Sequence, residues 1–315
     1  MSTPIRVGLS ACLLGYEVRW NGGHKRDPYI VDTLGRWFTW VPVCPEEEIG
    51  LGTPREPLRL EGDPKAPRLV FRDTGGDLTD RMRAYAATRA ARLERLDLSG
   101  YILKSDSPSC GMERVPVYGA GAQAVKRGTG LFAAALRRRL PLLPIEEEGR
   151  LHDPGLRENF IERVFAYRRL ADLLDARASA RRLIEFHTRH KFQLLAHSPT
   201  DYRALGRIAA ESRSAPTDRR ARYATLFMAA LAVRATPKKH ANVLQHILGH
   251  LKERLDGEDK RELLAAIDDC RCERAPLAVP IALLKHHLRR LGVPYVRDQV
   301  YLDPHPHELL LRRHA

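Results

Sequence analysis

The sequence has no apolar run long enough to cross a membrane, and its first residues lack the basic segment and long apolar stretch of a secretory signal. It also contains no internal repeat, no low-complexity tract and no glycine-rich fingerprint of a phosphate-binding loop. These absences argue against secreted, membrane-spanning and repeat proteins. We therefore expect a cytoplasmic protein whose 315 residues form two domains, each with a core of its own.

Cysteine is scarce, at five of 315 residues, and a chain in a reducing cytosol uses thiols as ligands or nucleophiles more often than as disulfides. Cys12, Cys44 and Cys110 each follow a short apolar run that predicts a strand; the runs are residues 5–9, 37–43 and 101–103. In an open α/β sheet, the loops at the carboxyl ends of the strands bind ligands. The three thiols are therefore predicted to meet at that edge as an active-site metal centre.

The spacing of these three cysteines does not identify the metal, because no two of them form a Cys-x-x-Cys pair. Three thiolates can hold zinc with an open fourth position, or an iron–sulfur cubane whose fourth iron has no protein ligand. Three buried and inert cysteines are the alternative. Glu46 and Ser107 lie close to Cys44 and Cys110 in the sequence, and they would place a proton-transfer group and a hydroxyl beside the centre.

The first half of the chain alternates between strand and helix patterns. Helical spacing of apolar residues covers 77–96 and 130–139, a short helix is expected over 27–36, and further strands are expected at 69–72 and 141–145. Such alternation predicts an α/β domain, residues 1–150, with a mostly parallel sheet and helices on both faces.

The second half, residues 151–315, shows helical periodicity and few strand signals, so we expect an all-α domain. The expected helices are 156–176, 178–195, 200–210, 219–235, 238–255, 259–270 and 280–291. An acidic run, Gly149 and Pro154 interrupt the pattern, and they place the domain boundary between residues 146 and 154.

Positive charge is concentrated in the second half. Residues 1–150 contain 23 Lys and Arg against 19 Asp and Glu, whereas residues 151–315 contain 30 against 20, a net charge of +10. A basic surface of this kind favours a polyanionic partner that it would bind through phosphate groups. The alternative is a protein that is merely soluble and rich in arginine.

Three sequence blocks of the first half resemble the motif set of the thiouracil desulfidase (TudS) family, over about residues 4–150. The blocks are Ser10-Ala11-Cys12-Leu13-Leu14-Gly15, Cys44-Pro45-Glu46 with Thr53-Pro54-Arg55, and Leu103-Lys104 with Ser107-Pro108-Ser109-Cys110-Gly111. The resemblance implies that Cys12, Cys44 and Cys110 bind a 4Fe-4S cluster and that Glu46 and Ser107 are catalytic. The chain departs from the family at Glu47-Glu48-Ile49, where we expect an apolar stretch.

The second half resembles the YbgA-type helical domain, over nearly all of residues 180–315. The matching blocks are Phe186 to Lys191, Leu194 to Ser198, Pro237 to Asn242, Pro280 to Arg290, and Pro304-His305-Pro306. The fusion of the two domains resembles the RudS proteins, which remove sulfur from 4-thiouridine in transfer RNA to give uridine and sulfide. The resemblance implies the same reaction here, with thiolated tRNA bound by the helical domain and no membrane partner. The expected phosphate contacts are Arg189, Lys191, Lys238, Lys239, Lys285, Arg289 and Arg290.

Two other functions fit the same residues. The substrate would be a free thiobase such as 2-thiouracil if the basic half served solubility or protein interaction. A non-catalytic RNA-binding protein would instead use the three cysteines for a structural zinc. Affinity for RNA separates the first alternative from tRNA desulfuration. Metal content, zinc or iron with sulfide, separates the second alternative from both enzymes.

Overall fold

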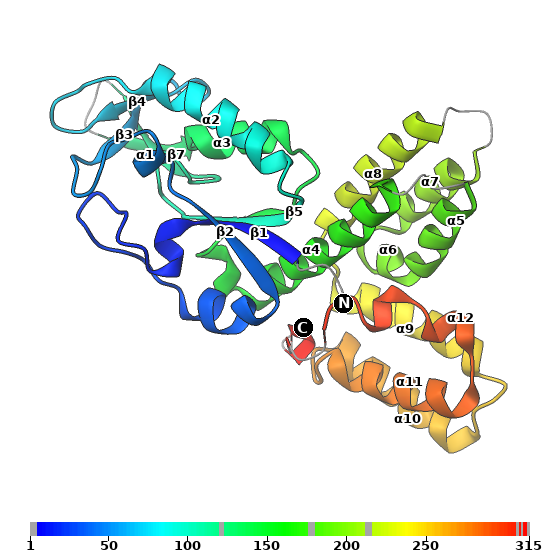
Figure 1. The fold of residues 1–315 in the computed structure, drawn as a ribbon. Helices are drawn as coiled ribbons and strands as arrows, with labels where there is room; N and C mark the ends of the chain where they lie inside the picture. The colour runs from blue at the N-terminus through cyan, green and yellow to red at the C-terminus, as the bar shows by residue number, and fades with distance from the viewer. Residues whose placement is uncertain are drawn as a thin grey trace. The chain divides into compact units, whose positions relative to one another are not determined.

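The computed structural model describes residues 5–119, 123–175, 180–211, 216–306, 309 and 311–313. The chain divides into two compact units, Met1–His152 and Asp153–Ala315 (Figure 1). Among the described residues, every helix is too short or too polar to span a membrane. The two units are an α/β domain and an all-α domain, as the sequence predicted.

A parallel four-stranded sheet forms the centre of the first unit. Its strands are β1 (Ile5–Ser10), β2 (Phe38–Val43), β5 (Leu98–Leu103) and β8 (Ile145–Glu147), in the order β2-β1-β5-β8. All three strand pairs are parallel, so the carboxyl ends of β1, β2 and β5 lie at one edge of the sheet. The strand patterns over 5–9, 37–43 and 101–103 therefore predicted the strands that deliver the three cysteines.

Helices cover this sheet. The helices α2 (Thr79–Glu94) and α3 (Leu131–Arg139) run side by side along one face, and the helical turns η2 (Tyr29–Thr33) and η3 (Leu34–Arg36) lie on the other (Figure 1). The buried apolar residues of α2 recur at helical spacing; they are Met82, Ala86, Ala90 and Leu93. This apolar stripe explains why the helix forms and which face it turns to the core.

A second, mixed sheet lies beside the first. Its strands are β3 (Leu58–Glu61), β4 (Arg68–Phe71), β6 (Val115–Tyr118) and β7 (Ala124–Gly128), in the order β4-β3-β6-β7. Only β4 was predicted. The other strands have four or five residues each, β6 contains Pro116, and four of the five residues of β7 are exposed, so they carry little of the apolar alternation that identifies a strand.

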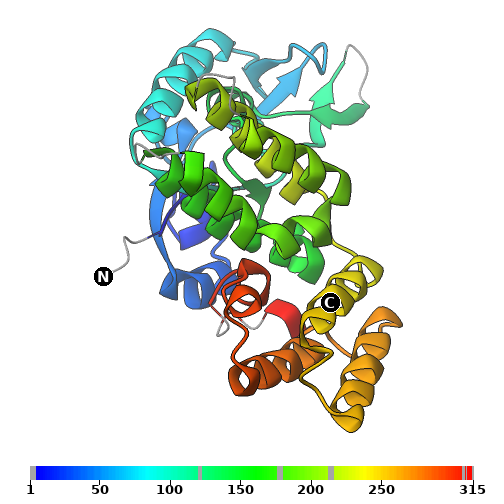
Figure 2. The same ribbon diagram turned by 90° about the vertical axis from the view of Figure 1, so that its right-hand side faces the viewer.

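The second unit is helical throughout its described residues. Its helices are α4 (Pro154–Asp175), α5 (Ala180–Arg189), α6 (Lys191–His197), α7 (Pro199–Ala210), α8 (Pro216–Ala232), α9 (Pro237–Leu251), α10 (Gly257–Arg271), α11 (Ala278–Leu291) and α12 (Pro294–Arg297). Helices α5, α7 and α8 pack together, α9 to α12 form a second group, and α6 contacts both (Figures 1 and 2). The prediction of a single helix over 178–195 was wrong, because the helix is interrupted at His190, between α5 and α6. Residues 178 and 179 lie outside the described part.

Gly8 of β1 faces Tyr101 of β5 across the parallel pair. A Cβ atom at Gly8 would lie 2.1 Å from Cδ2 of the tyrosine ring, so any side chain there would overlap it. Tyr101 is fully buried and also packs against Phe132 of α3, at 6.0 Å between ring centroids. The ring therefore has no room to move aside.

We expect Gly8→Ala to lower the free energy of unfolding of the first unit by about 1–3 kcal/mol, because it overpacks a rigid contact. Urea titration followed by tryptophan fluorescence measures this, since Trp20, Trp37 and Trp40, all three tryptophans of the chain, lie in this unit. Gly119→Ala is the control, because a Cβ atom at Gly119 meets no atom within 4 Å. Equal stability of the two variants would contradict the packing argument.

Candidate functional site

The three cysteines line one cavity of about 450 Å³ at the carboxyl edge of the parallel sheet. Cys12 lies in the helical turn η1 (Ala11–Leu14) directly after β1, and Cys44 lies between β2 and the short helix α1 (Pro45–Glu48). Cys110 follows β5 by seven residues in a tight loop. Cys12 and Cys110 are buried, and Cys44 is half-buried.

The loop that presents Cys110 is shaped by Ser107. The Ser107 hydroxyl oxygen accepts hydrogen bonds from the backbone N–H groups of Ser109 at 3.3 Å and Cys110 at 3.1 Å. The carbonyl oxygen of Ser107 accepts a further bond from the N–H of Gly111 at 2.8 Å. Ser107 therefore fixes the direction of Cys110, and it also lines the cavity.

Burial raises the pKa of all three thiols. The pKa of Cys12 rises to about 11, that of Cys44 is raised, and that of Cys110 lies well above its ordinary value. The neighbouring thiols add to the effect of burial, since Cys44 raises the pKa of Cys12, and both raise the pKa of Cys110. Three thiols this close and this buried favour ionisation only when a cationic group compensates their charge.

Glu46 lines the same cavity and is held by two side chains. The Ser109 hydroxyl donates to Oε1 at 2.9 Å. The guanidinium of Arg55 donates to Oε2 from Nε at 3.0 Å and from Nη2 at 2.7 Å. The carboxylate is thereby fixed in orientation, with a bidentate cation on one oxygen and a hydroxyl on the other.

Arg55 is the residue that sequence reasoning missed. Its side chain is only 4% exposed and donates further to Glu47 at 3.0 Å and to the carbonyl oxygens of Gly52 and Val18 at 2.8 Å each. Thr53-Pro54-Arg55 was noted as part of a motif, but its spacing from Glu46 gave no sign of direct contact. The acidic departure from the family pattern also has a structural explanation, because Glu47 binds Arg55, while Glu48 accepts from Tyr85 at 2.8 Å.

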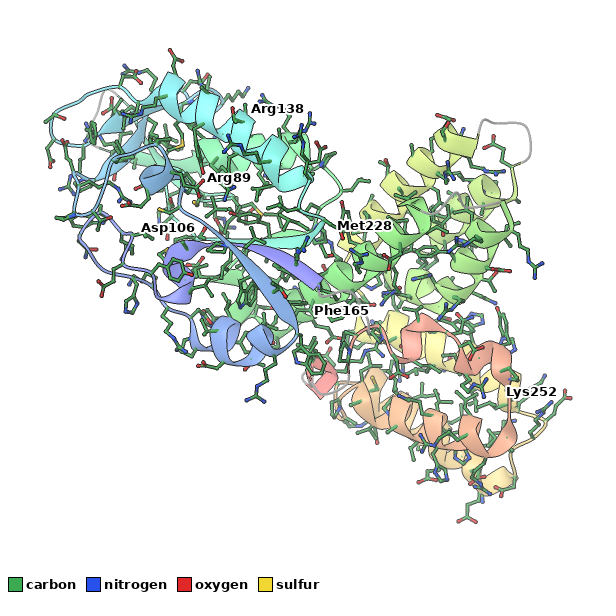
Figure 3. All side chains as sticks on the ribbon, viewed as in Figure 1. Arg89, Asp106, Arg138, Phe165, Met228 and Lys252 are labelled. Atoms are coloured by element: carbon green, nitrogen blue, oxygen red, sulfur yellow. The ribbon has the colours of Figure 1, made fainter. Side chains whose placement is uncertain are left out.

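The rim of the cavity carries cationic and aromatic side chains. Arg19, Lys25 and Lys104 line it together with Asp106, which Figure 3 labels, and with Trp20, whose side chain is 43% exposed. Lys104 is already engaged, because its ammonium donates to Glu148 and to the carbonyl oxygen of Ser105. Trp20 supplies an accessible aromatic face at the entrance.

The donor set suits a group with several metal ions better than a single ion. Within the described ranges, no three Cys, His, Asp or Glu side chains are grouped closely enough to hold one metal ion. The three thiols instead surround a shared cavity. In a cubane cluster each thiolate binds a different iron, so this spread of thiols fits the 4Fe-4S cluster that the family resemblance implied.

Comparison with known proteins relates both parts of the chain to families. Residues 7–148 match the family model of 2-thiouracil desulfurase, and residues 191–306 match that of a protein family of unknown function, DUF1722. The chain is 30% identical over 152 residues to the uncharacterized protein YbgA of Escherichia coli (strain K12), a match that covers 48% of this chain and 90% of YbgA. The chain is a 2-thiouracil desulfurase family member fused to a YbgA-like domain.

Two further relatives match this desulfurase family member. The uncharacterized protein YbbK of Bacillus subtilis (strain 168) is 32% identical over 136 residues, which cover 41% of this chain and 88% of YbbK. A solved structure, the [4Fe-4S]-dependent thiouracil desulfidase TudS, is 28% identical and covers 47% of this chain and 94% of its own, with a TM-score of 0.39.

The seven basic residues predicted for RNA contact in the YbgA-like domain differ in their exposure and in their contacts with other residues. Arg189, Lys238, Arg289 and Arg290 are exposed. The other three have partners: Lys191 lies over the rings of Phe192 and Tyr295, Lys239 donates to the carbonyl oxygen of His197 at 2.6 Å, and Lys285 pairs with Asp303 at 2.6 Å. Their role in RNA binding stays a prediction.

The remaining cysteines are not part of the candidate site. Cys270 is buried in α10, and Cys272 is exposed just after this helix. Neither lines the cavity that contains Cys12, Cys44 and Cys110.

We expect Arg55→Ala to lower the free energy of unfolding of the desulfurase domain by about 3 kcal/mol, because it leaves the half-buried carboxylate of Glu46 without its cation and several acceptors without their donor. Urea titration with tryptophan fluorescence again reports the first unit. Arg26→Ala is the matched control, because Arg26 pairs with Asp32 on the surface, and we expect it to cost less than about 1 kcal/mol. If both variants lowered the free energy of unfolding by the same small amount, the hydrogen bonds of Arg55 would contribute little to the stability of the domain.

Proposed function

We propose that the protein is a 4Fe-4S-dependent desulfidase that converts 4-thiouridine in tRNA to uridine and releases sulfide. The observation that carries the proposal is the cavity of the desulfurase domain, where three thiols, two of them buried, and the fixed carboxylate of Glu46 line the same space. The family match to 2-thiouracil desulfurase supports the reaction class, and the spread of three thiols around one cavity supports the cofactor.

Cys12, Cys44 and Cys110 would hold the cluster through three thiolates. When bound, the cluster supplies an iron without a protein ligand, which acts as a Lewis acid toward the soft thiocarbonyl sulfur. The positive charge of the cluster core would also compensate the charge of the three thiolates, whose pKa values are raised in its absence. The reaction exchanges the sulfur of a C=S bond for the oxygen of water and yields a carbonyl and hydrogen sulfide, so it needs no redox partner.

Glu46 is the residue placed to move protons in this exchange. Arg55 holds Oε2, and Ser109 holds Oε1 through a single hydrogen bond, which leaves acceptor capacity on Oε1 for a water molecule in the cavity. Glu46 takes a proton from that water while the water oxygen attacks the thiocarbonyl carbon. Ser107 contributes its hydroxyl to the cavity wall while its oxygen holds the Cys110 loop.

The cavity would hold a pyrimidine base beside the cluster, and its rim suits an unstacked nucleotide. Enzymes that act on a base in folded RNA extrude it into a pocket and read it there. Trp20 offers a stacking surface for that base, while Arg19 and Lys25 lie where a backbone phosphate would enter. The YbgA-like domain, with 30 basic against 20 acidic residues, would bind the rest of the tRNA.

A free thiobase such as 2-thiouracil is the second candidate substrate. The cavity of about 450 Å³ would also accept a base without its ribose and phosphate, and the family name refers to such a compound. In that case the exposed basic residues of the YbgA-like domain would have no part in turnover.

The first experiment follows 4-thiouridine in thiolated tRNA with anaerobically reconstituted protein, by loss of its absorbance and by nucleoside analysis. We expect conversion to uridine. Cys110→Ala should lose the colour of the cluster and the activity together, whereas Glu46→Gln should keep the colour and lose roughly 10²–10⁴-fold in turnover. Gly119→Ala, where an added Cβ atom meets no atom within 4 Å, is the control for general damage. A fully active Cys110→Ala protein, or no conversion of tRNA by protein with a loaded cluster, would contradict the proposal.

Charge reversal tests the role of the second unit. We expect the combined change Lys238→Glu and Arg289→Glu to weaken tRNA binding by roughly tenfold or more and to reduce its salt dependence, because each exposed residue that contacts a phosphate releases a counterion. Fluorescence anisotropy at several salt concentrations measures both effects. Arg297→Glu, at another exposed position of the same unit, should change the affinity less. Unchanged affinity of the double variant would show that Lys238 and Arg289 do not contact tRNA. Turnover of a free thiobase should be the same with and without the two changes.

A further inference from the structure

A pocket of about 320 Å³ in the YbgA-like domain is lined by three arginines, of which only Arg189 is among the residues predicted for RNA contact. Arg169 comes from α4, and Arg182 and Arg189 come from α5, which contacts α4 (Figure 1). Arg182 and Arg189 are seven residues apart, so they lie on one face of α5. The buried side chains of Leu173 and Phe186 form the apolar part of the wall.

Arg169 has a guanidinium that is only partly satisfied. Its side chain is partly buried, and Nε donates to Nε2 of His190 at 3.3 Å, while Nη1 donates to the carbonyl oxygen of Pro304 at 2.9 Å. Nη2 is buried and has no hydrogen-bond partner among the residues that the structure describes. A buried N–H donor without an acceptor costs free energy. Because Arg169 lines the pocket, an acceptor bound there would satisfy this nitrogen.

His190 orients Arg169 without neutralising its charge. Nδ1 of His190 lies 2.7 Å from the carbonyl oxygen of Phe186, which can only accept, so Nδ1 carries the proton and Nε2 accepts from Arg169. Burial, together with the nearby Arg169, lowers the pKa of His190 well below its ordinary value, so the ring is neutral. Burial also lowers the pKa of Arg169 to about 10, which leaves the guanidinium protonated at neutral pH.

The two carboxylates that line the pocket are already paired with other arginines. Asp172 pairs with Arg168, and Glu185 pairs with Arg181, in each case four residues apart on one helix. Neither Arg168 nor Arg181 lines the pocket. The two ion pairs therefore leave the charge of the three lining arginines uncompensated.

The balance of charge at the pocket is positive. Glu162, the carboxylate that raises the pKa of Arg169, is itself paired with His197. Arg182 and Arg189 are exposed, and neither forms an ion pair with a described residue. Five arginines and two carboxylates remain when the lining residues and their partners are counted, a net charge of +3. A pocket with this charge favours an anion.

A phosphate group suits these donors better than a carboxylate does. The two oxygens of a carboxylate lie in one plane, and a single guanidinium can satisfy both. The oxygens of a phosphate point in different directions, so they accept from guanidinium groups that come from two helices. The volume of about 320 Å³ lies at the lower end of the range for small-ligand pockets.

We propose that this pocket binds a phosphate group, with Arg169 as its inner donor and Arg182 and Arg189 as its outer donors. The group has two sources. The backbone of tRNA presents one charged phosphate per nucleotide, and this source rests on the proposed function. A free phosphate or a phosphate monoester is the other source, and it brings about two charges to one point.

Calorimetric titration of the full-length protein with sodium phosphate at constant ionic strength tests the pocket. We expect saturable binding with a Kd of about 1 mM or lower. Sodium acetate is the matched probe, because it is an anion whose two oxygens are coplanar, and it should bind at least tenfold more weakly. No saturable binding of phosphate, or equally tight binding of acetate, would overturn the proposal.

The combined change Arg182→Gln and Arg189→Gln removes the outer donors, and we expect it to weaken phosphate binding at least tenfold. Arg203→Gln with Arg261→Gln is the control, because it removes the same charge from exposed positions of α7 and α10 that do not line the pocket. Arg169→Gln should also abolish binding, but it breaks hydrogen bonds within the domain, so the double variant is decisive. Equal phosphate affinity of wild type and the double variant would refute the assignment.

Fluorescence anisotropy with unthiolated tRNA separates the two sources and needs neither a cluster nor turnover. If the pocket binds the RNA backbone, the variant at Arg182 and Arg189 should bind tRNA more weakly than the control variant with the same net charge. If the source is a free phosphate compound, the two variants should bind tRNA equally, while only the variant at Arg182 and Arg189 loses inorganic phosphate. Both measurements are independent of desulfuration, so this proposal and the proposed function fail separately.

Discussion

The parallel pairing of β1 with both β2 and β5 is the constraint on which the candidate site depends. Ser10 at the end of β1 is level with Val43 at the end of β2, and Leu9 is level with Ile102 of β5. This register brings the ends of the three strands together, and the loops that follow them carry Cys12, Cys44 and Cys110 to one cavity. A shift of one residue in either pair would turn alternate side chains to the opposite face and disperse the thiols.

The loops beyond these strands fix the final orientation of the site residues. The thiols would be inert in a buried position without a compensating group, and the carboxylate of Glu46 would be free to turn without Arg55 and Ser109. The same unit thus contains two kinds of order: backbone register, which places residues to within a few ångströms, and side-chain hydrogen bonds, which set their final direction. Chemistry at a thiocarbonyl carbon needs both, because proton transfer depends on direction as well as distance.

Much of this organisation could be predicted from the sequence. The strands that end before Cys12, Cys44 and Cys110 have dense apolar patterns, and the helices of the second unit repeat apolar residues at helical spacing, so local signals were sufficient. The pairing of β3 with β6 joins distant parts of the chain, and the contact of Arg55 with Glu46 spans an irregular segment of nine residues, so no local pattern encodes either. The break at His190 was missed because its surroundings keep helical periodicity on both sides.

The contact between Gly8 and Tyr101 has a consequence for how the sequence can change over time. The tyrosine ring occupies the space that a side chain at position 8 would need, and Phe132 and the core hold the ring in place. A larger residue at position 8 is acceptable only after position 101 has become smaller. The two positions, 93 residues apart, are therefore expected to vary together among homologues or not at all, because the intermediate with both side chains has no room in the core of the sheet.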